Sequence, residues 1–269
     1  MKNTGVLLFA FHSKKFDYLK LAQWSAKNIK KFLNLPVCLI TDIDVEDQKS
    51  FEHVIKTKPF GTTRFDYSTN ESYTWNNGQR YEAFKLTPFE TTLVLDVDYI
   101  VASDQLLKLL DDPRDFICHG SSVDVTGKTQ ETPTFGKLHL PMAWATVIKF
   151  TKSFQAELIF YLMEMIQKNY SHYANLYHFQ DRTYRNDYAL SIALYIAAGH
   201  RLTDEFFCSW PLFNSHASET VQKNAPNSYN IVYHKTVNKR QKLMRNTIND
   251  FDIHVMNKLS LENIIETDL

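Results

Sequence analysis

The stretch TPFETTLVLDVDYIV, residues 87–101, places two acids at the end of the most strongly apolar strand that the sequence predicts. Asp96 and Asp98 flank Val97, and alternate residues of an extended chain point to the same side. Two carboxylates on one side could share a hard divalent cation. An unpaired buried carboxylate is costly, so these acids must find a cation or emerge at the strand end. The alternative is a strand that simply ends in solvated aspartates, because two acids one residue apart are a short pattern.

Before this stretch, the sequence predicts a strand, a helix and a second strand. Residues 5–11 are a continuous apolar run, residues 16–32 carry apolar side chains at helical spacing, and residues 36–42 (PVCLITD) are a second apolar run. This order predicts an α/β fold with a mostly parallel, Rossmann-like central sheet flanked by helices. Nucleotide binding is then expected at the C-terminal ends of the strands.

The rest of the chain predicts further elements of the same domain. Residues 58–77 and most of the C-terminal third show little periodicity and are expected to be irregular, the first as a loop over a site. No repeat or linker interrupts residues 1–269, which we interpret as a single domain with a nucleotide-binding half (1–100) and an acceptor-binding half (101–269). Strands are expected at 51–57, 115–120, within 135–150 and at 250–256, and helices at 79–86, 104–112, 153–167 and 187–198.

Composition argues against several classes of protein. The 30 basic and 30 acidic residues give a formal net charge of zero, which argues against nucleic-acid binding through bulk charge and leaves room only for a local basic patch. The three cysteines, Cys38, Cys118 and Cys208, are far apart, so we expect a reducing compartment rather than a disulfide framework. No apolar run is long enough to span a bilayer, so we expect a cytoplasmic protein with no membrane partner.

Three segments carry a resemblance to a known class of enzymes. The opening at 9–42, the segment at 87–101 and the ending IHVMNK at 253–258 resemble the uridine-binding unit, the DxD segment and the C-terminal strand of GT-A glycosyltransferases, including the glycogenin-like family. With RNDYALSIA at 185–193, the chain also resembles uncharacterised phage-encoded proteins. The resemblance implies a GT-A fold and metal-dependent sugar transfer from a nucleotide diphosphate sugar, UDP-linked, with Mn²⁺ or Mg²⁺ as the cofactor. A phage-encoded protein would act in the host cytoplasm.

The resemblance also implies roles around the metal. Asp96 would contact the sugar or ribose and share the metal with Asp98, which would bind it directly. His254 would supply a nitrogen ligand and Lys258 would pair with diphosphate oxygens, where a divalent ion neutralises the leaving group. The spacing from His254 to Lys258 is shorter than in that family and lacks its Gly and its Pro-Trp. His234, in VYHKTVNK, is a rival metal ligand in a similar setting.

Four further residues are candidates for nucleotide binding. Ala10 and Phe11 end the first strand, Tyr18 could stack on the base, and Arg80 precedes the DxD strand, where similar enzymes carry a basic residue over the nucleotide. The alternatives are a Tyr18 ring that packs on the sheet and a solvated Arg80.

The acceptor side is predicted from a second group of residues. Asp187 directly precedes an apolar helix, where an acid faces the acceptor in GT-A enzymes; it would be the catalytic base of an inverting reaction or an orienting group in a retaining one. The alternative is a helix N-cap. Trp144 could pack against a sugar or a base, or simply fill the core. The basic run at 235–245 predicts a solvated loop, a phosphate-contacting flap or a grip on a DNA backbone.

The acceptor itself stays open. The phage resemblance implies 5-hydroxymethylcytosine in phage DNA, and a glycan or cell-envelope acceptor is the alternative. A different class is a non-catalytic nucleotide-sugar-binding phage protein, but a protein without activity need not retain Asp96, Asp98, Asp187 and His254 together. A nucleotidyltransferase would be expected to carry a Gly-rich basic signature near the first strand, and FAFHSKKF at 9–16 has none.

Overall fold

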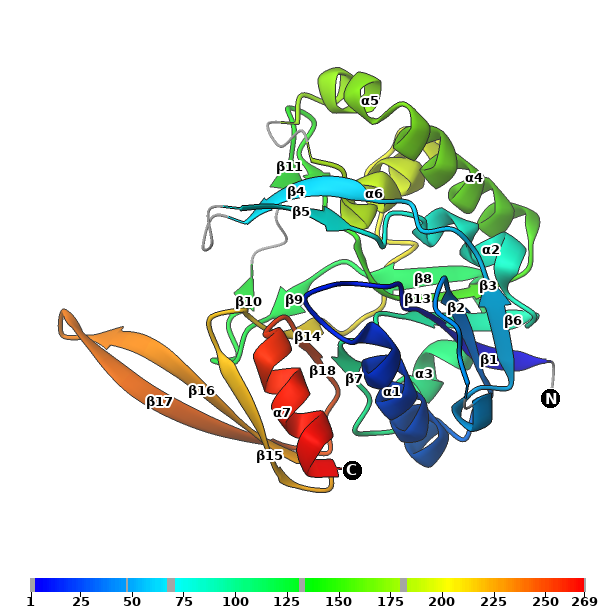
Figure 1. Cartoon of the computed structure of the whole chain (residues 1–269). Helices are drawn as coiled ribbons and strands as arrows, with labels where there is room; N and C mark the ends of the chain where they lie inside the picture. The colour runs from blue at the N-terminus through cyan, green and yellow to red at the C-terminus, as the bar shows by residue number, and fades with distance from the viewer. Residues whose placement is uncertain (1–2, 47, 67–70, 131–133, 180–182, 269) are drawn as a thin grey trace.

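A six-stranded sheet forms the centre of the computed structural model, which describes residues 3–46, 48–66, 71–130, 134–179 and 183–268 (Figure 1). β13 alone runs antiparallel to its neighbours, so the predicted mostly parallel α/β sheet is confirmed. The strand order is β3 (His53–Lys56), β2 (Val37–Thr41), β1 (Thr4–Phe9), β6 (Thr91–Leu95), β13 (Trp144–Thr151) and β8 (Phe116–His119).

Helices cover both faces of this sheet. Residues 6 and 8 of β1 belong to the apolar cluster that contains α1 (Tyr18–Leu33), whereas residues 7 and 9 belong to the cluster that contains α4 (Phe154–Lys168) and α6 (Asn186–Ala197). Side chains alternate between the faces of a strand, so a continuous apolar run is what a strand covered on both sides requires. The three helices begin and end within two residues of their predicted bounds.

A second sheet meets the first at the two acids. Its strand order is β10 (Thr129–Gln130), β9 (Ser122–Val123), β14 (Leu212–Ser215), β18 (Ile253–Val255) and β7 (Tyr99–Ile100). β6 of the first sheet ends at residue 95 and β7 of the second begins at residue 99, so residues 96–98 connect the two sheets. These residues form a turn closed by the Tyr99 N–H, which donates to the Asp96 carbonyl oxygen at 3.0 Å. The prediction that the acids lie on one extended strand is therefore wrong.

Two regions that were expected to be irregular form antiparallel ribbons. Residues 58–77 contain the pair β4 (Thr62–Asp66) and β5 (Glu71–Trp75), with residues 67–70 outside the described part of the chain. The C-terminal third contains β15 (Thr220–Ala225), β16 (Ser228–Val237) and β17 (Arg240–Asn249). The outer half of β16–β17 is exposed on both faces. A ribbon of this kind needs no alternation of apolar and polar residues, so hydrophobic periodicity does not reveal it.

A C-terminal helix, α7 (Lys258–Asp268), was also missed by the sequence prediction. It packs against α1 and β15, and its buried side chains Leu261, Ile264 and Ile265 have helical spacing. Within the described residues, no helix combines the length and the apolar character needed to cross a membrane. The remaining elements are short: 3₁₀ turns at Gln48–Ser50 and Arg80–Glu82, helices α2 (Ala83–Leu86), α3 (Leu107–Leu110) and α5 (Tyr170–Leu176), and strands β11 (Thr134–Phe135) and β12 (Leu140–Pro141).

Candidate active site

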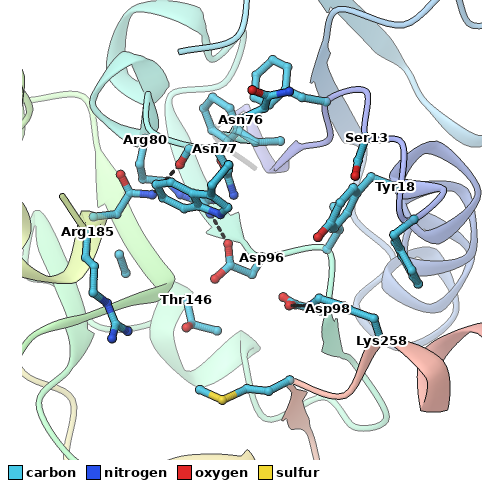
Figure 2. Close-up of a pocket in the computed structure, with 18 of the residues that line it drawn as sticks. Ser13, Tyr18, Asn76, Asn77, Arg80, Asp96, Asp98, Thr146, Arg185 and Lys258 are labelled. Atoms are coloured by element: carbon cyan, nitrogen blue, oxygen red, sulfur yellow. Dashed lines mark hydrogen bonds and ion pairs between the residues drawn. The ribbon is translucent and has the colours of Figure 1, made fainter. Parts of the chain in front are cut away.

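A pocket of about 730 Å³ lies where the C-terminal ends of β1 and β6 meet the second sheet (Figure 2). Its walls come from the loop after β1, the end of β5, the turn at residues 96–98, the start of α6 and the end of β18. Parallel sheets characteristically bind ligands at this edge, beyond the carboxyl ends of the strands. Of the nine site residues predicted from the sequence, the pocket brings together eight: Phe11, Tyr18, Arg80, Asp96, Asp98, Asp187, His254 and Lys258.

The residues predicted to bind a metal converge. Asp96, Asp98 and His254 each offer one ligand atom, and these three atoms lie within 4.8 Å of one another. The turn at 96–98 supplies the two carboxylates, while β18 supplies the imidazole because residue 254 pairs with residue 99 of β7. A carboxylate pair with one imidazole is a donor set that suits a divalent cation such as Mn²⁺ or Mg²⁺.

The orientation of His254 fits a metal ligand. Its Nδ1 lies 3.0 Å from the Asn214 Oδ1, and an amide oxygen only accepts, so Nδ1 carries the proton. The other ring nitrogen, Nε2, lies 3.5 Å from the Asp98 Oδ1. Nε2 of a neutral imidazole and a carboxylate oxygen both donate electron pairs to a metal ion. A cation would satisfy both, and a second residue that fixes the histidine tautomer is typical of metal sites.

Each of the two acids forms an ion pair with a basic side chain. The Arg80 guanidinium, on a side chain only 1 % exposed, forms an ion pair with Asp96, and its charge also lies 5.1 Å from the centre of the Phe9 ring. The Lys258 ammonium forms an ion pair with the Asp98 Oδ2. Burial alone would raise the pKa of Asp98, but Lys258 and His254 outweigh it and hold that pKa below its usual range. Asp98 is therefore charged and paired with Lys258. Arg80 is buried rather than solvated.

The side of the pocket that the sequence predicts to bind a nucleotide is formed by the loop after β1. Phe11 and Tyr18 line it, and Tyr18 lies edge-on to Phe16 with ring centres 5.0 Å apart. The His12 N–H donates to the Asp42 Oδ1 at 2.7 Å, and the Asn76 amide donates to the His12 carbonyl at 3.0 Å, so this loop is held from two sides. The predicted residue Ala10 does not line the pocket. Its side chain lies in the apolar core, and its N–H donates to the Ile40 carbonyl at 3.0 Å.

Each carboxylate oxygen of Asp187 accepts a hydrogen bond. Its Oδ1 accepts from the Ala145 N–H and its Oδ2 accepts from the Arg185 Nη2, each at 2.9 Å. Helix α6 begins at Asn186, and Arg185 is the N-cap position, so the alternative of Asp187 as the N-cap is wrong. Asp187 instead ties the first turn of α6 to β13. Trp144 is 5 % exposed and lies in the apolar core, and it also borders the pocket.

Several lining residues were not predicted from the sequence. The lack of periodicity predicts a loop at residues 74–77, but the aromatic and amide side chains of SYTWNN at 72–77 are of the kind that line binding sites. The rival ligand His234 lies exposed on β16 and does not line the pocket, and the basic run at 235–245 does not line it either. The additional lining residues include His12, Ser13, Lys15, Phe16, Thr74, Trp75, Asn76, Asn77, Thr146, Arg185 and Met256.

Comparison with known proteins gives similarity of fold only. No family model and no curated protein matches the chain. Among solved structures, the glycosyltransferase GlyE of Streptococcus pneumoniae TIGR4 is similar at 14 % identity and a TM-score of 0.41, over 80 % of this chain and 45 % of that one. The chain thus spans less than half of the length of that protein.

Two other glycosyltransferases are similar at the same level. The galactosyltransferase LgtC, in complex with donor and acceptor sugar analogues, is 13 % identical with a TM-score of 0.45, over 71 % of this chain and 70 % of that one. Mouse xyloside xylosyltransferase 1 is 11 % identical with a TM-score of 0.41, over 77 % of this chain and 84 % of that one. Likenesses at this level carry no substrate and no residue role to this chain.

Proposed function

We propose that this chain is a metal-dependent glycosyltransferase that moves a sugar from a nucleotide diphosphate sugar, UDP-linked, to an acceptor. One observation carries the proposal. Asp96, Asp98 and His254 present ligand atoms within 4.8 Å of one another in the pocket at the carboxyl ends of parallel strands. The Lys258 ammonium lies at the same point, so the pocket combines a metal-ligand set with a phosphate-binding cation.

Each residue has a task in this proposal. Asp96, Asp98 and His254 hold Mn²⁺ or Mg²⁺, and Asp96 also contacts the sugar or ribose. The metal supplies positive charge against the leaving diphosphate. Lys258 pairs with diphosphate oxygens, and Phe11 and Tyr18 border the space for the nucleoside. Arg80 holds the Asp96 carboxylate in place from its buried position.

Asp187 is proposed as an orienting residue. Both of its carboxylate oxygens already accept a hydrogen bond, from Ala145 and Arg185. A general base needs an oxygen within reach of the acceptor hydroxyl. The orienting role uses these contacts as they stand, whereas the base role would use a second lone pair on one of the two oxygens.

The acceptor remains a prediction. The candidates are 5-hydroxymethylcytosine in phage DNA and a glycan or cell-envelope acceptor, and no contact of the described residues separates them. A non-catalytic nucleotide-sugar-binding protein is the competing class. The division into a nucleotide-binding half and an acceptor-binding half also stays a proposal, although the metal ligands come from both sides of residue 100.

Calorimetry with UDP tests the donor site directly. We expect UDP to bind in the presence of Mn²⁺ or Mg²⁺ and to lose most of its affinity in EDTA. Equal affinity with and without the metal would refute a metal-bridged site. Release of UDP from a panel of UDP-sugars, with water as the acceptor, then separates an enzyme from a binding protein: a tight UDP complex that turns over none of the sugars would support the non-catalytic class.

A further inference from the structure

The outer half of the β16–β17 hairpin projects beyond the body of the protein (Figure 1). We define residues 234–245 as the arm. Its base is fixed to the body because Tyr229, Ile231 and Tyr233 are buried in the core beneath it. The Asn246 amide also donates to the Val125 carbonyl at 2.6 Å, next to the arm. The ten cross-strand pairs of β16 and β17 continue without a register shift to the turn. The arm is therefore a supported ribbon.

The arm carries a concentrated positive charge in a chain whose net charge is zero. No acid occurs between Glu219 and Asp250. Lys235 lies directly opposite Lys242 across the two strands, and like charges at such positions destabilise a ribbon. Among the described residues, none of the arm's basic side chains forms an ion pair. These side chains, all exposed, are Lys235, Lys239, Arg240, Lys242 and Arg245.

The turn at the end of the arm places a charged residue, Lys239, in a backbone conformation that is unfavourable for it. Asn238 and Lys239 have φ angles of 51° and 62°, the left-handed conformation at both central positions of a two-residue turn. Asn followed by Gly is the preferred pair in such turns, because a side chain at the second position is strained there. Lysine at position 239 therefore costs stability, and it places an ammonium group at the outermost point of the arm.

Apolar side chains accompany these charges. Leu243 is 66 % exposed and Met244 is 37 % exposed, and as neighbours on one strand they point to opposite faces of the ribbon. The two tyrosines of β16, Tyr229 and Tyr233, are buried, so neither is available to stack on a nucleic-acid base. A phosphate backbone would satisfy the charges of the arm but would do nothing for its aliphatic side chains.

We propose that the arm docks this protein on an anionic lipid surface. The basic side chains contact the headgroups, while Met244, which lies on the same face of the ribbon as Lys235 and Lys242, enters the boundary between headgroups and acyl chains. This is the combination of basic and aliphatic residues with which peripheral proteins bind anionic membranes. The contact is peripheral and needs no membrane-spanning segment, but it departs from the expectation of a protein with no membrane partner. It is independent of the proposed sugar transfer, since no residue of the arm lines the pocket.

The test is co-sedimentation of the full chain with vesicles of phosphatidylcholine, alone or mixed with phosphatidylglycerol. We expect binding to the mixed vesicles only, weakening with added salt. The double variant Lys235→Gln with Lys242→Gln removes the cross-strand pair and should lower the partition coefficient roughly 25-fold, because each basic residue near such a surface contributes about a factor of five. Met244→Ser should weaken binding without changing its dependence on anionic lipid, whereas Leu243→Ser, on the opposite face, should bind like the wild type.

A matched control removes two exposed lysines elsewhere, with Lys27→Gln on α1 and Lys108→Gln on α3. It changes the net charge by the same amount and should bind like the wild type to within about twofold if the arm is the docking element. An equal loss in the control variant would overturn the proposal, as would absence of binding to mixed vesicles. Binding of the full chain to duplex DNA is measured in parallel by fluorescence anisotropy. Binding to DNA at least as tight as to mixed vesicles would assign the arm to nucleic acid instead.

Discussion

The Lys258 ammonium is in contact with the Asp98 Oδ2, so a carboxylate that is predicted to bind a metal already has a cation beside it. A divalent ion at this carboxylate would meet the charge of Lys258 unless that side chain finds another anion. The diphosphate of a nucleotide sugar is such an anion. Metal and nucleotide binding should therefore strengthen each other, because each relieves the repulsion that the other would meet.

Replacing Lys258 with Met should uncouple the two ligands. Without the ammonium group, Mn²⁺ should bind to the nucleotide-free protein about tenfold more tightly, which corresponds to about 1.4 kcal/mol, while UDP affinity falls. Titration of Mn²⁺ followed by electron paramagnetic resonance, with and without UDP, measures both effects. Lys258→Arg is the control that keeps the charge and should retain the coupling. Weaker Mn²⁺ binding in Lys258→Met without UDP would contradict this account.

Replacing Asp98 with Asn should remove metal-dependent UDP binding and also lower stability. Relief of repulsion between two acids could have been expected to stabilise this variant. However, Arg80 pairs with Asp96, and Lys258 pairs with Asp98. The substitution therefore leaves a partly buried lysine unpaired rather than removing a repulsion. We expect a loss of about 1 kcal/mol, reduced because Lys258 is about a third exposed. Urea unfolding in EDTA measures it, and a more stable variant would refute the pairing.

The order of the site residues along the chain could be predicted from the sequence, but their geometry could not. The apolar run before Asp96 indicated a buried strand, and β6 confirms it. The spacing of the two acids predicts an extended chain, whereas the structure brings them together in a turn between two sheets. The turn also depends on a long-range contact, because the Thr146 carbonyl accepts from the Asp96 N–H at 2.9 Å, and no local sequence pattern contains this contact.

The residues around the two acids also have contacts that could not be predicted from the sequence. Arg80 contacts Asp96, 16 residues away along the chain, and His254 contacts Asn214, 40 residues away. The position of Arg80 on its helix does not by itself distinguish a solvated arginine from a buried one. An acid before a helix is a common N-cap, so the sequence alone allows that role for Asp187. Its hydrogen bond to Ala145 on β13 is a long-range contact that no local pattern contains.

Replacing Asn214 with Ala should weaken the metal site without touching a ligand. Asn214 fixes the imidazole of His254 through its contact with Nδ1, and loss of such a partner typically lowers metal affinity by about 10- to 100-fold. Calorimetric titration with Mn²⁺ in the presence of UDP measures the change. Ser215→Ala is a matched control, because Ser215 is the next buried residue of β14 and its hydroxyl has no hydrogen-bond partner among the described residues. Equal affinity in both variants would remove Asn214 from the site.

The buried histidine of β8 should make the protein sensitive to acid. Burial lowers the pKa of His119 from 6.5 to about 4, although its Nδ1 donates to the Trp210 carbonyl at 3.1 Å. Between these values the unfolded chain binds more protons than the folded one, so stability falls as the pH falls from 6.5 to 4. The contribution is at most about 3 kcal/mol. His119→Gln, which keeps a donor but does not titrate, should show a flatter dependence of unfolding free energy on pH. Parallel curves for the two proteins would contradict this.

Replacing Lys239 with Gly should stabilise the protein, unlike most substitutions. Residue 239 has a φ angle of 62°, and glycine adopts this conformation without the clash that a side chain produces. Part of the gain is lost because glycine is freer in the unfolded chain, so we expect about 0.5–1 kcal/mol in urea unfolding. Lys239→Ala is the control, because it removes the charge and keeps the strain, and it should leave stability unchanged. If the glycine variant is no more stable than the alanine variant, the turn is not strained. If it is more stable but binds anionic vesicles less well, lysine at the outermost point of the arm lowers stability in favour of docking.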